Sequence, residues 1–338
     1  MLDALNNIEF IIVADPYLTP TAVALADYVL PTAMSCERDS FREWWAPLRA
    51  IKKVTSYYEA KSDDEILLEL GKRTRPDVFN QWADTREMLD WLINKRNRGK
   101  CEYRTFDELV AMGYEYAPFE YRKHEKGLLL GDGMEGFNTP TGLIELYSTI
   151  FEQFGLDPLP YYREPRESPV STPELAKEFP FVLTTGRRAY EFFHSEHRQL
   201  GPMRDFHPDP IVRINTQDAR DLGIENGDWV WLENVHGKCK QRAEVDGGMK
   251  QGVVSAEHGW WFPEREAAAP SLYGSLESNV NQLTTQCDIG PSGYGAPYKC
   301  QICKVYKVTE SNDTLERTEA ETQRSIAARL YARPENCK

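Results

Sequence analysis

Short apolar stretches separated by tight glycine turns fill the chain between residues 211 and 256. The turns contain Gly227, Gly237 and Gly248. The predicted strands cover residues 211–214, 229–232, 238–245 and 252–256. Short strands at such regular spacing are typical of a small barrel, which closes on itself and leaves no free sheet edge. This part of the sequence therefore predicts a closed barrel of four to six strands.

A basic loop follows another short apolar run, residues 181–183. The run ends in Thr184-Thr185-Gly186, where glycine permits close approach of another group to the strand-end amides. Three arginines and two histidines come within the next residues: Arg187, Arg188, His194, His197 and Arg198. The planar guanidinium fork of arginine binds phosphate in a bidentate way. Two interpretations stay open at this point: the loop is basic and solvated, or it binds a phosphorylated ligand.

The first residues indicate a β-α-β unit. Residues 8–14 are almost continuously apolar, which is typical of a strand buried on both faces of a parallel sheet. A short helix through residues 22–26 and a second strand at 27–31 follow. In open α/β sheets ligands bind at the carboxyl ends of the strands, here near Asp15, Thr19 and Thr21. Turn and helix-capping roles are the alternative for Asp15 and Thr19. Seven residues cannot supply the neighbours of a parallel strand, so we expect the chain to begin inside a domain.

The region between these two parts has a different pattern. Apolar residues recur at helical spacing in residues 63–73 and 85–94, and each run follows a capping Asp or Thr. Aromatic residues without a clear period follow, and a proline-rich linker ends near Glu178. Helix-forming residues with mixed charges at 313–332 predict a peripheral helix at the end of the chain.

Charge and cysteine content restrict the partners. The net charge is −13, from 40 Lys and Arg against 53 Asp and Glu, which argues against nucleic-acid binding. No apolar run is long enough to span a membrane, and residues 1–7 lack the basic start of an export signal. Seven cysteines are too few for a disulfide scaffold of this length, so a reducing compartment is expected. Cys300 and Cys303 have metal-type spacing, but their apolar neighbours favour strand thiols over a zinc site.

Four blocks of sequence, in this order, resemble the molybdopterin oxidoreductases of the dimethyl-sulfoxide-reductase type. They are 15–21 with 26–31, then 139–142 with 145–147, then the Thr-Gly-Arg and histidine loop with the strands after it, then Asn279-Val280-Asn281-Gln282-Leu283 with Asp288 and Lys299. Residues 193–198 and His258-Gly259-Trp260-Trp261-Phe262-Pro263-Glu264 look most like the branch with acetylene hydratase, pyrogallol transhydroxylase and the catechol dehydroxylases. In isolation, core packing explains the three aromatic residues of the second segment equally well.

The resemblance implies the following architecture. Residues 1–50 would finish a Rossmann-like dinucleotide-binding domain of the α/β class, and residues 51–174 would form a helical and irregular connector. Residues 175–310 would form a six-stranded double-psi β-barrel that binds the molybdopterin dinucleotide, followed by a helical tail at 311–338. The implied cofactor is molybdenum or tungsten bis(molybdopterin guanine dinucleotide). The residues that match its binding positions are Asp15, Thr19, Thr21, Thr185, Gly186, Arg187, His194, Arg198, Asn281, Asp288, Tyr298 and Lys299.

Two family features have no counterpart here, the cysteine motif for an iron–sulfur cluster and the region that supplies the protein ligand to the metal. We therefore expect the chain to be the C-terminal, cofactor-binding part of a larger catalytic subunit that is inactive by itself. Its partners would be the N-terminal domains, an iron–sulfur electron-transfer subunit and a small, phenolic substrate. The location would be cytoplasmic, or exported if those domains carry a twin-arginine signal. The alternatives are a non-catalytic molybdopterin-binding module and a barrel used for interaction without cofactor. Leu143 stands where many members have lysine.

Overall fold

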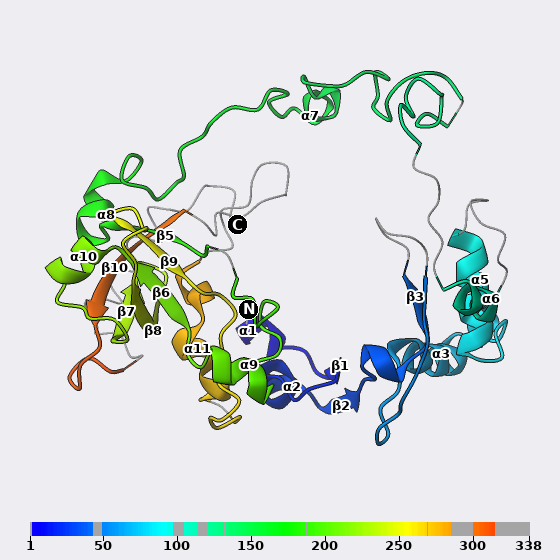
Figure 1. Ribbon diagram of the computed structural model, residues 1–338, viewed down its shortest axis with the longest axis horizontal. Helices are drawn as coiled ribbons and strands as arrows, with labels where there is room; N and C mark the ends of the chain where they lie inside the picture. The colour runs from blue at the N-terminus through cyan, green and yellow to red at the C-terminus, as the bar shows by residue number, and fades with distance from the viewer. Residues whose placement is uncertain are drawn as a thin grey trace. The chain divides into compact units, whose positions relative to one another are not determined.

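The computed structural model describes residues 2–42, 49–96, 105–113, 120–131, 133–186, 188–268, 270–284 and 300–314. The chain divides into two compact units, residues 1–138 and residues 139–338, and each is described by itself (Figure 1). The division falls inside the predicted connector. The predicted helical tail lies mostly outside the described residues.

The first unit begins with the predicted β-α-β arrangement. Helix α1 (Leu2–Leu5) precedes strand β1 (Ile12–Asp15), helix α2 (Pro20–Leu25) and strand β2 (Tyr28–Pro31). The two strands pair in parallel, with Ile12 opposite Tyr28. The predicted burial of the first strand on both faces is wrong, because Ile12 is 50% exposed. Among the described residues only β2 pairs with β1. The other edge of β1 therefore has no partner strand, and its side chains remain partly exposed.

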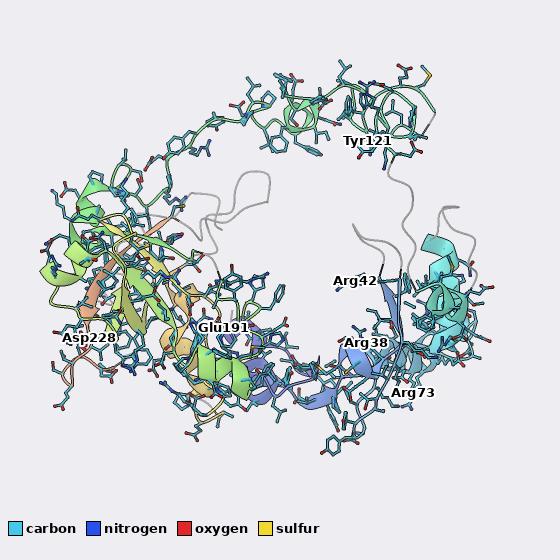
Figure 2. All side chains as sticks on the ribbon, in the orientation of Figure 1. Arg38, Arg42, Arg73, Tyr121, Glu191 and Asp228 are labelled. Carbon is cyan, nitrogen blue, oxygen red and sulfur yellow. The ribbon has the colours of Figure 1, made fainter. Side chains whose placement is uncertain are left out.

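A second, mostly helical cluster completes the first unit. Its elements are η1 (Ser35–Glu37), β3 (Ser40–Arg42), β4 (Arg49–Ile51), α3 (Asp63–Thr74), α4 (Pro76–Phe79), α5 (Thr85–Arg96) and α6 (Phe106–Met112). Helices α3 and α5 confirm the two helices expected from the periodicity. The buried core consists of Leu89, Ile93, Phe106 and Leu109, from α5 and α6. Arg38 reaches Asp63 at the first turn of α3, at 3.7 Å (Figure 2).

The second unit contains the predicted six-stranded closed barrel, which is confirmed. Its strands are β5 (Phe181–Thr184), β6 (Ile211–Ile214), β7 (Trp229–Glu233), β8 (Lys238–Val245), β9 (Val253–Ala256) and β10 (Gln301–Lys307). Their order around the barrel is β10-β5-β9-β6-β8-β7. The pairs β5–β9 and β6–β8 are parallel, and the other pairs are antiparallel. The segment after β5 leads through α9 to β6, which is separated from β5 by β9 in the barrel order.

The second unit also contains short helices. They are α7 (Thr149–Gln153), α8 (Pro173–Glu178), α9 (Gly201–Phe206), α10 (Thr216–Asp221), η2 (Leu272–Gly274), α11 (Ser275–Ser278) and η3 (Val280–Leu283). Of these, α8, α11 and η3 contact barrel strands. The barrel core is apolar and includes Leu183, Val212, Ile214, Val230 and Val254. Among the helices of the described ranges, none combines the length and the apolar character that crossing a membrane requires.

The cysteines of the barrel are core side chains. Cys239 in β8 and Cys303 in β10 are fully buried in the barrel core. Burial raises the pKa of both thiols well above the ordinary value, so they stay protonated and unreactive. Cys303 is thus the strand thiol that the apolar neighbours of the Cys300–Cys303 pair predicted.

Candidate functional site

The turn at the end of β5 is shaped for close approach. The amide of Gly186 donates to the hydroxyl of Thr184 at 3.2 Å, and Thr185 between them is buried. Gly186 has a φ of +54°, and a Cβ on it would lie 2.2 Å from the Oγ of Ser255 in β9. Glycine is required at this position both for its backbone conformation and for the space beside β9.

The histidine loop that follows has a backbone conformation unusual for its residues. His194 and His197 have φ values of +54° and +73°, in the left-handed region that side chains with a Cβ rarely adopt. The Nδ1 atom of His194 lies 3.0 Å from the Nε2 atom of His258, which follows β9. Strained residues of this kind persist only where their surroundings hold them, and they are frequent at functional sites.

Arg198 is buried at the base of this loop, with only 3% of its surface exposed. Its guanidinium carbon lies 3.8 Å from the centre of the Phe192 ring and 4.5 Å from the Trp260 ring. Nη2 donates to the carbonyl of His194 at 2.8 Å. Burial lowers the pKa of Arg198 to about 10, so the side chain is still charged at neutral pH. An arginine in a loop is expected from sequence to be solvated or paired with a nearby acid, and the burial of Arg198 against two aromatic rings contradicts that expectation.

Buried donors without a protein acceptor lie around the Trp260 ring. Arg204 in α9 approaches this ring at 5.3 Å, next to Arg198 at 4.5 Å. Within the described part of the chain, the unpaired donors here are Arg198 Nε, Arg204 Nε, Arg204 Nη1 and Trp260 Nε1. Because a buried donor normally has a partner, these atoms give the loop the capacity to bind a further polar group.

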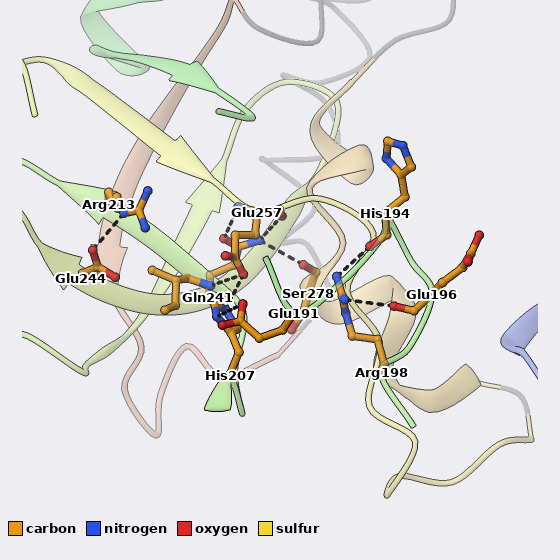
Figure 3. A network of polar contacts seen from close by, with 11 residues as sticks. Glu191, His194, Glu196, Arg198, His207, Arg213, Gln241, Glu244, Glu257 and Ser278 are labelled. Carbon is orange, nitrogen blue, oxygen red and sulfur yellow. Dashed lines mark hydrogen bonds and ion pairs between the residues drawn. The ribbon is translucent and has the colours of Figure 1, made fainter. Parts of the chain in front are cut away.

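A polar network connects the loop to the barrel (Figure 3). The ring of His207 lies between two carboxylates, with Nε2 at 2.9 Å from Glu257 and Nδ1 at 3.7 Å from Glu191. The backbone of Glu257 is bound in turn by the buried Gln241 of β8, which donates to the Glu257 carbonyl at 2.7 Å and accepts from its amide at 3.1 Å. Figure 3 shows these side chains meeting beside the segment that carries His194 and Arg198. The network fixes both ends of the loop to the barrel.

In the first unit, Asp15 and Thr19 have the turn and capping roles that were left open for them. Asp15 is the last residue of β1, and its Oδ1 accepts from the amide of Tyr17 at 2.8 Å. Thr19 caps helix α2 by accepting from the amide of Ala22 at 3.3 Å. Thr21 is exposed in the first turn of α2. All three lie at the carboxyl end of β1, where open sheets place their ligands.

The other expected site residues are only partly described. Asn281 is exposed in η3, and its carbonyl accepts from the hydroxyl of Thr284 at 3.0 Å. Arg187, Asp288, Tyr298 and Lys299 lie outside the described residues. The structure thus brings Thr185, Gly186, His194 and Arg198 together within the second unit.

Sequence reasoning missed Glu257 as a partner of this loop, and it considered Glu191 only as a partner of arginine. Core packing was one of two explanations for Trp260, and Trp260 does lie in a cluster with Phe192 and Phe262. The available signal was Glu257 directly before the His-Gly-Trp-Trp segment, since a carboxylate at the end of a barrel strand needs a cationic partner.

Comparison with known proteins gives a family for this arrangement. Residues 181–301 match the molydopterin dinucleotide binding domain. This range begins at β5 and includes the Gly186 turn, the histidine loop and the segment from Glu257 to Trp261.

Individual relatives cover more of the chain. Acetylene hydratase of Syntrophotalea acetylenica is 34% identical over 78% of this chain and 35% of its own length. Dopamine dehydroxylase of Eggerthella lenta is 30% identical over 92% of this chain and 36% of its own length. The structure of the acetylene hydratase from Pelobacter acetylenicus superimposes with a TM-score of 0.79 and 31% identity, over 91% of this chain and 41% of that one. The chain therefore spans roughly two-fifths or less of the length of these relatives.

Proposed function

This chain belongs to the dimethyl-sulfoxide-reductase type of molybdopterin enzymes, and from that we propose that it is the cofactor-binding part of a larger catalytic subunit. Its cofactor would be molybdenum or tungsten bis(molybdopterin guanine dinucleotide). The observation that carries the proposal is the exposed His194, which lies 3.0 Å from His258 inside the matched domain, in the loop that follows the strand-end turn at Gly186.

The residues present fit such a group. A pterin dinucleotide presents ring edges with donors and acceptors and carries a pyrophosphate, which favours backbone amides and cations. The Gly186 amide is already bound to Thr184, so the fit rests on the exposed His194 and on the buried unpaired donors of Arg204 and Trp260 next to the loop. In the second unit Thr185, Gly186 and Arg187 would meet the pterin and its phosphates, together with His194.

Other residues would contact further parts of the cofactor. Asp15, Thr19 and Thr21 would meet a guanine dinucleotide at the end of β1, and Asn281, Asp288, Tyr298 and Lys299 would contact the second pterin. When bound, the metal would supply oxygen-atom, hydroxyl or hydration chemistry on a small, phenolic substrate. The remainder of the subunit would supply the protein ligand of the metal and an iron–sulfur cluster, and an iron–sulfur subunit would deliver electrons.

The test is a measurement of cofactor content. The chain is produced in a host that makes the guanine dinucleotide form of the cofactor, and molybdenum, tungsten and acid-released guanine nucleotide are measured per chain. We expect nucleotide in the wild-type chain and at least about tenfold less in His194→Ala. His124→Ala, which changes a partly exposed histidine of the first unit, is the control. Equal nucleotide content in wild type and His194→Ala would contradict the assignment, and no nucleotide in either would favour a barrel without cofactor.

A further inference from the structure

Three consecutive carbonyl groups of the histidine loop are each bound by a side chain. Arg198 Nη2 donates to the carbonyl of His194 at 2.8 Å, and Arg198 Nη1 lies 3.4 Å from the carbonyl of Glu196. Between these two, the indole Nε1 of Trp261 donates to the carbonyl of Ser195 at 2.7 Å. Three consecutive peptide groups are therefore fixed by two side chains, one inside the loop and one in the segment after β9.

Glycine at position 259 lets that segment lie directly against the loop. Gly259 has a φ of +70°, and a Cβ on it would lie 3.1 Å from the carbonyl carbon of His194 and from the amide of Ser195. Both atoms belong to backbone that is already held by Arg198 and Trp261, so neither can move away easily. Any other residue here would push the His194 peptide out of place.

The preceding residue, His258, fixes the orientation of the His194 imidazole ring. Its Nε2 lies 3.0 Å from Nδ1 of His194, so one of the two nitrogens donates a proton to the other. This contact leaves Nε2 of His194 as the nitrogen that is oriented toward a ligand. The backbone of His194 is meanwhile kept at a φ of +54°, which costs about 1 kcal/mol or more without such support.

We infer that Arg198, His258, Gly259 and Trp261 form a positioning clamp for His194 and do not bind the cofactor themselves. Arg198 lies flat between Phe192 and Trp260 and is 3% exposed, so both of its engaged nitrogens point at loop carbonyls. This reassigns Arg198 from cofactor ligand to positioning residue. The inference rests on the proposed function only for the identity of the ligand that His194 meets.

The experiment measures the His194–His258 contact in the complete cofactor-free chain. With ¹⁵N-labelled histidine, the scalar coupling between the two ring nitrogens reports whether the hydrogen bond exists. We expect it in the wild type and its loss in Trp261→Phe, which keeps an aromatic ring but removes the indole N–H together with its five-membered ring, and in Arg198→Lys, whose single ammonium cannot engage both carbonyls while stacked. Arg265→Lys is the control, because Arg265 is also stacked on an aromatic ring, Phe262 at 3.8 Å, but lies outside the clamp.

Guanine nucleotide content provides the second readout. We expect Trp261→Phe and Arg198→Lys to retain about ten- to a hundred-fold less nucleotide than the wild type, and Arg265→Lys to retain as much. Coupling that survives in both clamp variants would overturn the inference, and so would its loss with unchanged nucleotide content. If one of these variants does not fold, Gly259→Ala replaces it. A wild-type chain without nucleotide would refute the proposed function, whereas the coupling would still decide whether the clamp exists.

Discussion

The imidazole Nε2 of His236 lies 3.0 Å from the Glu167 carboxylate, and the two side chains are only 9% and 6% exposed. His236 stands in the turn between β7 and β8, and Glu167 belongs to the segment that leads into α8. The same turn is fixed by Asn234, whose Oδ1 accepts from the amide of His236 at 2.9 Å. The segment before β5 is thus attached to the β7–β8 turn of the barrel by a buried polar contact.

Glu167→Ala should lower the free energy of unfolding by about 2–4 kcal/mol, because it leaves the buried ring of His236 without this partner. Urea denaturation of the cofactor-free chain measures the loss. Glu174→Ala removes an exposed carboxylate that pairs with Lys177 at 2.7 Å, and it should change stability by no more than about 0.5 kcal/mol. Similar losses of unfolding free energy in Glu167→Ala and Glu174→Ala would show that the buried pair contributes no more to stability than the exposed pair.

Gly186→Ala should destabilise the chain by about 2 kcal/mol, of which about half comes from the left-handed backbone and half from the contact with Ser255. Removing the hydroxyl of Ser255 can relieve only the contact with the new Cβ and not the cost of the left-handed backbone. We therefore expect Gly186→Ala with Ser255→Ala to be about 1 kcal/mol more stable than the two single effects predict. Additive effects in this double-mutant cycle would mean that the two residues are not in contact.

Asp228 should make part of the stability dependent on pH. Its carboxylate accepts from the amide of Glu225 at 2.8 Å and lies 2.7 Å from the ammonium of Lys307 (Figure 2). Partial burial works against the charged form, but the contacts with Lys307 and Glu225 outweigh it and lower the pKa from its usual 3.8. A folded-state pKa below the unfolded one stabilises the protein above about pH 4, and this stabilisation disappears as the pH falls through the folded-state value.

Asp228→Asn should consequently cost about 1 kcal/mol at pH 7 and less at pH 3. Urea midpoints of wild type and variant at the two pH values give the comparison. A difference that stays constant or widens on acidification would exclude Asp228 as a source of the pH dependence.

The barrel was predictable because its strands have a period of two and end at glycine turns, so local pattern and fold agree. The apolar run of the first strand predicted burial that the described residues do not provide, since Ile12 remains half exposed. Burial depends on neighbouring strands, which the local sequence does not contain. Gly186 was expected to let a ligand approach the strand end, and the group that the structure places against it is Ser255 Oγ, on a strand far away in sequence.

The role of Arg198 could not be predicted for the same reason. A guanidinium in a loop is usually solvated, and the residues that bury this one, Phe192 and Trp260, are separated from each other by most of the barrel sequence. Likewise, the His194–His258 contact requires the ends of β5 and β9 to be neighbours, which follows from their parallel pairing. Parallel pairing between distant strands is set by topology and not by the period of either strand.

The burial of Arg198 leads to a test of its contribution to the fold. Arg198→Ala leaves a space between Phe192 and Trp260 and frees the carbonyl of His194, so it should lower the free energy of unfolding by about 2–3 kcal/mol. The loss is limited because the folded protein disfavours the charge, as the lowered pKa of about 10 indicates. Arg198→Met refills the space without a charge but still leaves the carbonyl unpaired, so we expect it between wild type and Arg198→Ala. Arg188→Ala, at an exposed arginine 4.3 Å from the Phe193 ring, should change stability by less than about 0.5 kcal/mol in the same urea titration. Arg198→Ala as stable as Arg188→Ala would mean that Arg198 is solvated in the absence of ligand, and would restore its role as a direct cofactor ligand.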